Sequence, residues 1–162
     1  MMSKTTSTWS RFIQLPRQEY MRNRTMALDE LDRFLAKPHI ARLATIYPNG
    51  KPHVVPIWFL AEEGAIFMST GADSVKVRNL RKNSQVAVTI DTWDGDFKLK
   101  GVVIEGKAEL ITDGVKEIAR KILIKYIGEQ GLNSPPARER LSWPLIVIKI
   151  NPEKILSWDQ TR

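Results

Sequence analysis

The sequence contains no cysteine and only two histidines, and these absences exclude several kinds of metal and redox centre. Without cysteine the chain forms no disulfide bond and no cysteine-ligated zinc or iron–sulfur centre. His39 and His53 are too few to build a histidine-ligated metal site within one chain. Sites that depend on cysteine sulfur or on several imidazole ligands are therefore excluded.

Long apolar segments are also missing. No run approaches the roughly 20 apolar residues that span a bilayer. Residues 1–20 lack the continuous apolar segment of a signal peptide. We therefore expect a cytoplasmic protein without membrane insertion.

Positive charge is in excess, with a formal net charge of +7 at pH 7. Such an excess indicates a polyanionic partner, which is either a nucleic acid or a phosphorylated cofactor. Basic residues gather in the leading segment and more tightly at residues 76–82, but no long basic run occurs. The sequence also contains no helix-turn-helix or RNA-recognition signature. Nucleic-acid binding is therefore the secondary interpretation.

The apolar pattern indicates one domain that is mainly β with flanking helices. A chain of 162 residues with 43% apolar content suits a single core, which we place at residues 27–162 after an N-terminal extension of residues 1–26. Apolar patterns predict strands at 41–47, 51–60, 65–70, 86–91, 98–112, 145–150 and 154–158. Helical spacing predicts helices at 27–35, 74–82 and 114–128, the last for core packing only, and Pro135-Pro136 predicts a loop at 131–140.

Short turns join the first three predicted strands. Residues 48–50 (Pro-Asn-Gly) and 62–64 (Glu-Glu-Gly) have turn chemistry, so these strands should form an antiparallel meander. Six to seven antiparallel strands with a few helices outside them favour a closed or half-open barrel.

The segment 67–81 is the strongest local candidate for a binding site. A predicted strand ends in Ser69 and Thr70, passes Gly71, and enters a helix whose first turns carry Lys76 and Arg78. Hydroxyl groups, free backbone N–H groups and nearby cations suit a phosphate. A helix capped by Ser74 with a solvated basic face explains the same pattern equally well, because both features are common.

Several segments in matching order resemble the pyridoxamine phosphate oxidase-like split barrels, which bind FMN or F420. They are Arg42-Leu43-Ala44-Thr45-Ile46, residues 50–59, residues 69–81, residues 101–110 and the closing Ile155-Leu156-Ser157-Trp158-Asp159. The resemblance covers residues 27–159 and implies a split β-barrel. It also implies a homodimer with two cofactor sites at the subunit interface.

The same resemblance implies roles for particular residues. Ser69, Thr70, Ser74 and Lys76 would hold the cofactor phosphate, with Arg78 and Asn79 adjacent. The isoalloxazine ring would lie along the strand formed by Val54, Val55, Pro56, Ile57 and Trp58, although strand aromatics such as Trp58 more often belong to the core. Trp143 or Trp158 would approach the ring from the partner chain, and His53 is interpreted as structural, with a proton donor as the alternative.

One signature of the true oxidases is missing. Their C-terminal aromatic-Trp segment followed by Arg-x-His is replaced by Leu141-Ser142-Trp143-Pro144-Leu145. The Lys76-to-Arg81 run and the Leu-Ser-Trp-Asp ending look closer to the branch of F420-dependent reductases. We therefore expect an oxidoreductase that uses FMN, or alternatively F420, for hydride transfer to or from a small molecule. A non-catalytic flavin-binding or redox-sensing protein and a basic nucleic-acid-binding barrel are the alternatives.

Overall fold

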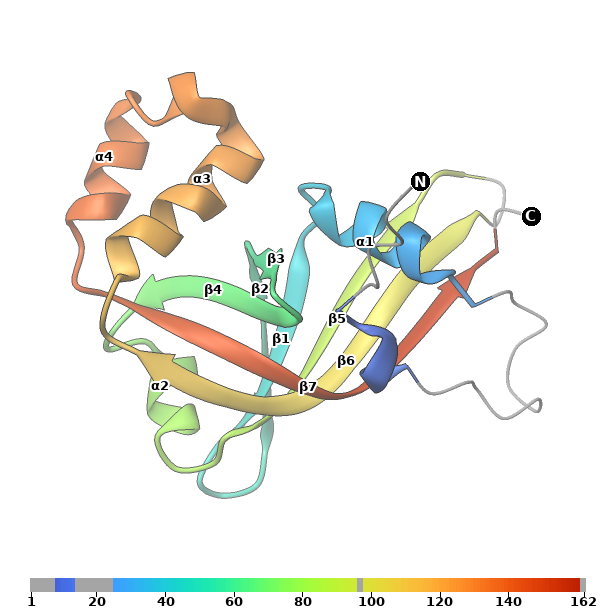
Figure 1. Cartoon of the computed structure of the whole chain (residues 1–162). Helices are drawn as coiled ribbons and strands as arrows, with labels where there is room; N and C mark the ends of the chain where they lie inside the picture. Colours follow the sequence, from blue (N-terminus) through green and yellow to red (C-terminus); the bar gives the residue numbers. More distant parts are fainter. Residues whose placement is uncertain (1–7, 14–24, 96–97, 161–162) are drawn as a thin grey trace.

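The computed structural model describes residues 8–13, 25–95 and 98–160, and Figure 1 shows their arrangement. Seven antiparallel strands form one sheet in the order β2-β1-β5-β6-β7-β4-β3. The elements are the 3-10 turn η1 (Ser10–Phe12), α1 (Leu28–Ala36), β1 (Ala41–Ile46), β2 (Pro52–Ile57), β3 (Leu60–Glu62), β4 (Ala65–Gly71), α2 (Val75–Leu80), β5 (Gln85–Trp93), β6 (Leu99–Ile111), α3 (Val115–Gly131), α4 (Pro135–Ser142) and β7 (Leu145–Asp159).

The sheet curls into a split barrel, as predicted. Its two edge strands, β2 and β3, follow one another in the chain and are separated only by Trp58 and Phe59. The two edges of the sheet must therefore meet at this point. The predicted strand at 51–60 is divided here because its first half pairs with β1 and its second half pairs with β4.

The long strands β6 and β7 form the spine of the barrel. The register between them shifts between Glu105 and Gly106, and Gly106 is opposite Pro152. A side chain at Gly106 would collide with the backbone carbonyl of Asn151, so the close approach of the two strands requires glycine here. The two strands predicted at 145–150 and 154–158 are therefore one strand that continues through Pro152.

Apolar side chains from the inner faces of the strands fill the barrel. Leu43, Ile66, Ile104 and Ile148 are fully buried, and α1 contributes Leu31, Phe34 and Leu35 at one end. Part of the predicted N-terminal extension belongs to the same core, because Trp9 is 3% exposed. The remainder of that extension, residues 1–7 and 14–24, lies outside the described residues.

Helices α3 and α4 form a hairpin at the opposite end from α1 (Figure 1). Gly128 interrupts α3 with a φ of 70°, a left-handed conformation that glycine adopts without strain. The prediction of a loop at 131–140 is wrong, because Pro135 and Pro136 form the first turn of helix α4. Proline suits the first turn of a helix, where its missing N–H group costs no hydrogen bond.

None of the described helices is both long and apolar enough to cross a membrane. Within the same residues, His, Asp and Glu side chains form no group of three that is placed to hold a metal ion.

Candidate functional site

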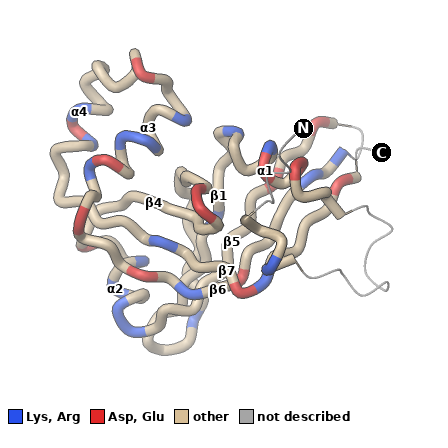
Figure 2. The backbone as a smooth tube through the Cα atoms, viewed as in Figure 1, with Lys and Arg blue, Asp and Glu red and all other residues tan. Residues whose placement is uncertain are grey.

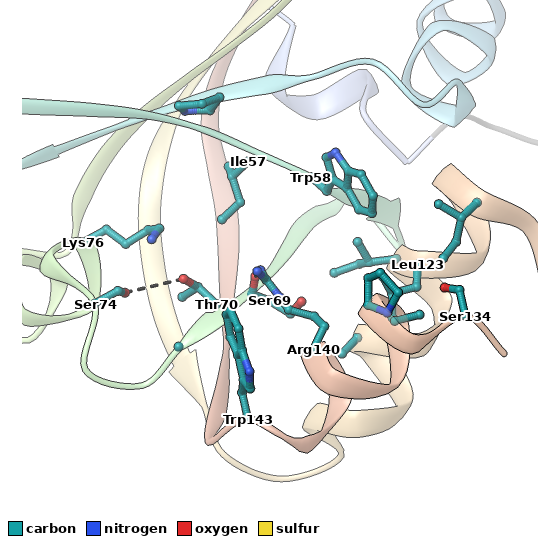
Figure 3. Close-up of a pocket in the computed structure, with 17 residues that line it drawn as sticks. Ile57, Trp58, Ser69, Thr70, Ser74, Lys76, Leu123, Ser134, Arg140 and Trp143 are labelled. Carbon is teal, nitrogen blue, oxygen red and sulfur yellow. Dashed lines mark hydrogen bonds between the residues drawn. The ribbon is translucent and has the colours of Figure 1, made fainter. Parts of the chain in front are cut away.

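A cavity of about 820 Å³ lies between the barrel and the α3–α4 hairpin (Figure 3). The ends of β2 and β4, the first turn of α2, and both helices of the hairpin surround it. Its lining consists of Pro56, Ile57, Trp58, Ser69, Thr70, Gly71, Ser74, Lys76, Ala119, Ile122, Leu123, Ile127, Ser134, Pro136, Ala137, Arg140 and Trp143. The structure thus brings together seven of the eleven residues that the sequence proposes for cofactor binding.

The polar end of the cavity combines hydroxyl groups with one ammonium group. Ser69 and Thr70 are buried at the end of β4, and the hydroxyl of Thr70 donates to Ser74 Oγ over 3.5 Å. Ser74 occupies the N-cap position of α2, but its side chain makes no capping hydrogen bond. Its hydroxyl faces Thr70 at the cavity instead (Figure 3). The capping hydrogen bond that a purely structural role of Ser74 would require is therefore not formed.

Lys76 places a half-buried positive charge beside these hydroxyls. Its ammonium group makes no hydrogen bond or ion pair with any residue that the structure describes. Burial lowers the pKa of Lys76, and the positive charge of Arg140 lowers it further. Figure 2 shows further positive charge on α2 and on the turn that follows it. A partly desolvated cation beside hydroxyl groups is suited to binding an anion.

Arg140 brings a second cation to the cavity, and the sequence analysis missed it. Its Nη2 donates to the carbonyl of Ser69 over 3.3 Å, and its guanidinium lies 5.2 Å from the ring centroid of Trp143. Both residues come from α4 and the turn that follows it. Ser134 followed by two prolines is a helix-start signal, and reading it as such would have predicted α4.

Trp58 forms a flat wall at the junction between β2 and β3. Its ring stacks on Tyr126 with centroids 4.4 Å apart and planes 2° apart. The Tyr126 hydroxyl donates to the carbonyl of His39 over 2.6 Å and accepts from the Phe59 N–H over 3.1 Å. Two backbone contacts therefore fix the tyrosine, and the tyrosine in turn supports Trp58.

Helix α3 forms the apolar wall opposite the barrel. Ala119, Ile122, Leu123 and Ile127 all line the cavity. The helix packs as expected, with Ala119, Ile122 and Leu123 buried, and the same face also lines the cavity. Periodicity alone shows that a helix has an apolar face, but not whether that face meets the core or a cavity.

Four of the proposed cofactor residues do not line the cavity. Val54 is 59% exposed, and Val55 packs against the core. The guanidinium of Arg78 donates to the carbonyl of Asp73 over 2.9 Å on the exposed side of α2. Asn79 is 2% exposed, and its amide donates to the hydroxyl of Thr45 over 3.1 Å.

The other singled-out residues also have structural contacts. His53 Nδ1 lies 3.3 Å from the hydroxyl of Thr45, consistent with its structural interpretation. The ring of Trp158 covers Gly101 on the neighbouring strand β6, and it is absent from the cavity lining. Trp143 lines the cavity of its own chain.

A half-buried lysine lies against the rings of Phe59 and Tyr126. Lys125 Nζ donates to the carbonyl of Leu35 over 2.8 Å and lies 3.4 Å from the ring centroid of Phe59. Burial lowers the pKa of Lys125 to about 7. Burial likewise lowers the pKa of nearby His39. These groups join α1 to α3 and lie outside the cavity lining.

Comparison with known proteins places this arrangement in a family. The 5a,11a-dehydrotetracycline/5a,11a-dehydrooxytetracycline reductase of Streptomyces rimosus is 30% identical over 132 residues, covering 77% of this chain and 78% of that protein. A conserved hypothetical protein from Mycobacterium tuberculosis has a similar structure, with a TM-score of 0.76, 25% identity, and coverage of 89% of this chain and 91% of that one.

A solved structure described as an F420 reductase shares the fold with a TM-score of 0.63 and 24% identity, over 76% of this chain and 94% of that one. The sequence profile described as pyridoxamine 5'-phosphate oxidase matches residues 27–159, the same span as the resemblance seen in the sequence. The chain belongs to the pyridoxamine 5'-phosphate oxidase family.

Proposed function

We propose that the chain is an oxidoreductase that binds FMN, or alternatively F420, in this cavity and transfers a hydride between the cofactor and a small organic molecule. The observation that carries the proposal is the position of Lys76. Its ammonium group is partly buried beside three hydroxyl groups and lacks a counterion among the described residues. Such a charge is costly unless an anionic ligand compensates it.

The donor set suits a phosphate. Lys76, Ser69, Thr70 and Ser74 can together donate several hydrogen bonds to phosphate oxygens. Gly71 leaves open space beside them, since nothing lies within 4 Å of the place where a side chain would begin. The residues present therefore fit the phosphate group of either cofactor.

The neighbouring wall suits a flat ring. Pro56, Ile57 and Trp58 lie next to the polar end, and the apolar face of α3 lies across from them. We propose that the cofactor ring lies along Pro56–Trp58 and that the α3–α4 hairpin limits the access of water. When bound, the cofactor supplies the hydride chemistry. The residues of the chain bind and orient it.

The cavity lining contains no carboxylate, histidine or tyrosine among the described residues. Lys76 and Arg140 are its only charged side chains in that part of the chain. The protein's contribution under this proposal is therefore binding, orientation and a positive electrostatic field. The reductase from Streptomyces rimosus supports a reductive reaction on an organic molecule.

We also propose a homodimer. The edge strand β2 ends at the cavity, and Val54 on this strand is 59% exposed. An exposed apolar residue on an edge strand is suited to contact with a second chain. Sedimentation of the purified protein with and without cofactor tests this state.

Titration with FMN and, separately, with F420 tests the proposed function. We expect binding near one cofactor per chain and a loss of about tenfold to a hundredfold in affinity in Lys76→Gln, which removes a charge-assisted contact. Lys82→Gln is the matched control, because Lys82 is exposed and does not line the cavity. Equal affinity in wild type and Lys76→Gln would refute the proposed site.

A further inference from the structure

Large apolar side chains remain exposed at the end of the cavity that faces the hairpin. Trp58 is 37% exposed, Ile127 38% and Trp143 45%, and all three line the cavity. They are three of the seven large apolar residues that are exposed in the described part of the chain. A cluster of exposed apolar side chains within a concave surface is typical of a ligand-binding region. We call the region bounded by Trp58, Ile127, Trp143 and Arg140 the hairpin compartment.

The shape of this compartment favours a flat ligand. Trp58 is held flat by its stacking on Tyr126. Trp58 lies near the top of the view in Figure 3, and Trp143 lies near the bottom. The guanidinium of Arg140 lies over the Trp143 ring. Leu123 adds an apolar wall from α3. Planar aromatic surfaces favour planar, largely apolar molecules.

Arg140 gives the compartment a positive charge. Its guanidinium has five N–H donors, and the structure assigns one contact to the carbonyl of Ser69. No carboxylate of the described residues forms an ion pair with it. Arg140 lies toward Trp143, whereas Lys76 lies beyond Thr70 on the other side (Figure 3). The cavity therefore holds two cations from different elements, close enough for the charge of Arg140 to lower the pKa of Lys76. A phosphate held by Lys76 and the hydroxyls would leave the remaining N–H donors of Arg140 for a second anionic group.

We propose that the hairpin compartment binds the organic substrate, and that this substrate is planar, largely apolar and carries an acidic oxygen, either a carboxylate or an enolate, which Arg140 binds. The proposal rests on the proposed function, in which Lys76 and the hydroxyls bind the cofactor phosphate. Arg140 is then a residue that determines substrate specificity. The planar guanidinium can donate two parallel hydrogen bonds to the two oxygens of one carboxylate, whereas a lysine ammonium does not offer this geometry.

Paired probes of equal shape test this proposal. Naphthoate carries a carboxylate, and naphthamide carries a neutral amide on the same ring. Each is titrated into FMN-loaded or F420-loaded protein, whichever cofactor binds, by calorimetry. We expect naphthoate to bind about tenfold more tightly than naphthamide, because only naphthoate offers the guanidinium a negative charge and two acceptor oxygens, whereas naphthamide offers one neutral carbonyl oxygen. Arg140→Gln should abolish this preference, and Arg140→Lys should restore only part of it.

Arg138→Gln is the matched control, because Arg138 is an exposed arginine on the same helix and does not line the cavity. The preference for naphthoate should persist in this variant. A preference that persists in Arg140→Gln, equal binding of the two probes, or no binding of either would overturn the proposal.

Cofactor titration of the same variants separates the two proposals. Arg140→Gln should change cofactor affinity less than threefold, whereas Lys76→Gln weakens it strongly. If both variants weaken cofactor binding equally, Arg140 belongs to the phosphate site, and the substrate proposal fails while the proposed function stands. If no cofactor binds, the proposed function itself fails, and titration of the probes into the cofactor-free protein still tests Arg140.

Discussion

Replacing Lys125 with methionine should remove a pH dependence of stability that the wild-type chain has above neutral pH. Burial lowers the pKa of Lys125 from 10.5 to about 7 in the folded chain. Between these two values the unfolded chain holds the proton and the folded chain does not. The free energy of unfolding therefore rises with pH across this window, and below pH 7 the folded state bears the cost of the buried charge.

The magnitude follows from the width of the window. Each pH unit between the two pKa values adds about 1.4 kcal/mol at most, so two units above pH 7 add about 2.7 kcal/mol. Lys125 is half-buried and keeps part of its hydration, so we expect about 1–2 kcal/mol. Its contacts with the carbonyl of Leu35 and the ring of Phe59 favour the charged form and also reduce the effect.

Urea unfolding at several pH values between about 6 and 9, followed by circular dichroism, measures this difference. The stability of wild type relative to Lys125→Met should rise by about 1–2 kcal/mol over this range, while all other titrating groups cancel. Lys121→Met controls for the loss of one positive charge from α3, because Lys121 is exposed. A wild-type-to-Lys125→Met difference that stays constant with pH would contradict the burial argument.

Three further substitutions test the fold. Gly106→Ala should cost about 1–3 kcal/mol of unfolding free energy in urea, because the added methyl group meets the carbonyl of Asn151 at the bulge. Asn79→Ala should cost about 1–3 kcal/mol by removing the buried hydrogen bond to Thr45, yet leave cofactor affinity unchanged, since Asn79 is outside the cavity lining. Gly128→Ala should lower the melting temperature, because its φ of 70° costs a residue with a side chain roughly 1–2 kcal/mol. Unchanged stability in any of these variants would contradict the contact or backbone conformation on which that prediction rests.

Much of the fold can be predicted from local sequence patterns, because strands with one buried face show alternating apolar residues and short turns show glycine, proline and asparagine. The strand boundaries that were predicted wrongly depend on pairing with strands far away in the sequence. Pro152 looks like the end of a strand, but it continues β7 because it is opposite the bulge at Gly106. The division of residues 51–60 into β2 and β3 likewise depends on which strands lie beside each half.

The candidate site shows the same limit. Ser69, Thr70, Ser74 and Lys76 lie within eight residues of one another, so the local pattern suggests a phosphate site there, and the family resemblance assigns these four residues to it. Arg140 comes from a helix far along the chain, and only the packing of the α3–α4 hairpin brings it to Ser69. Proximity in sequence does not imply a shared site here, since Asn79 lies close to Lys76 in the chain but its side chain contacts Thr45 in the core.

A crystal structure of the protein with FMN or F420 bound would decide whether this cavity is the cofactor site. We expect the cofactor phosphate within hydrogen-bond distance of Lys76 Nζ and the hydroxyl of Thr70, and the ring along Pro56–Trp58. The hairpin compartment beside Trp143 and Arg140 should stay open for a second molecule. A cofactor bound outside this cavity, or with its phosphate on Arg140 and not on Lys76, would contradict the account.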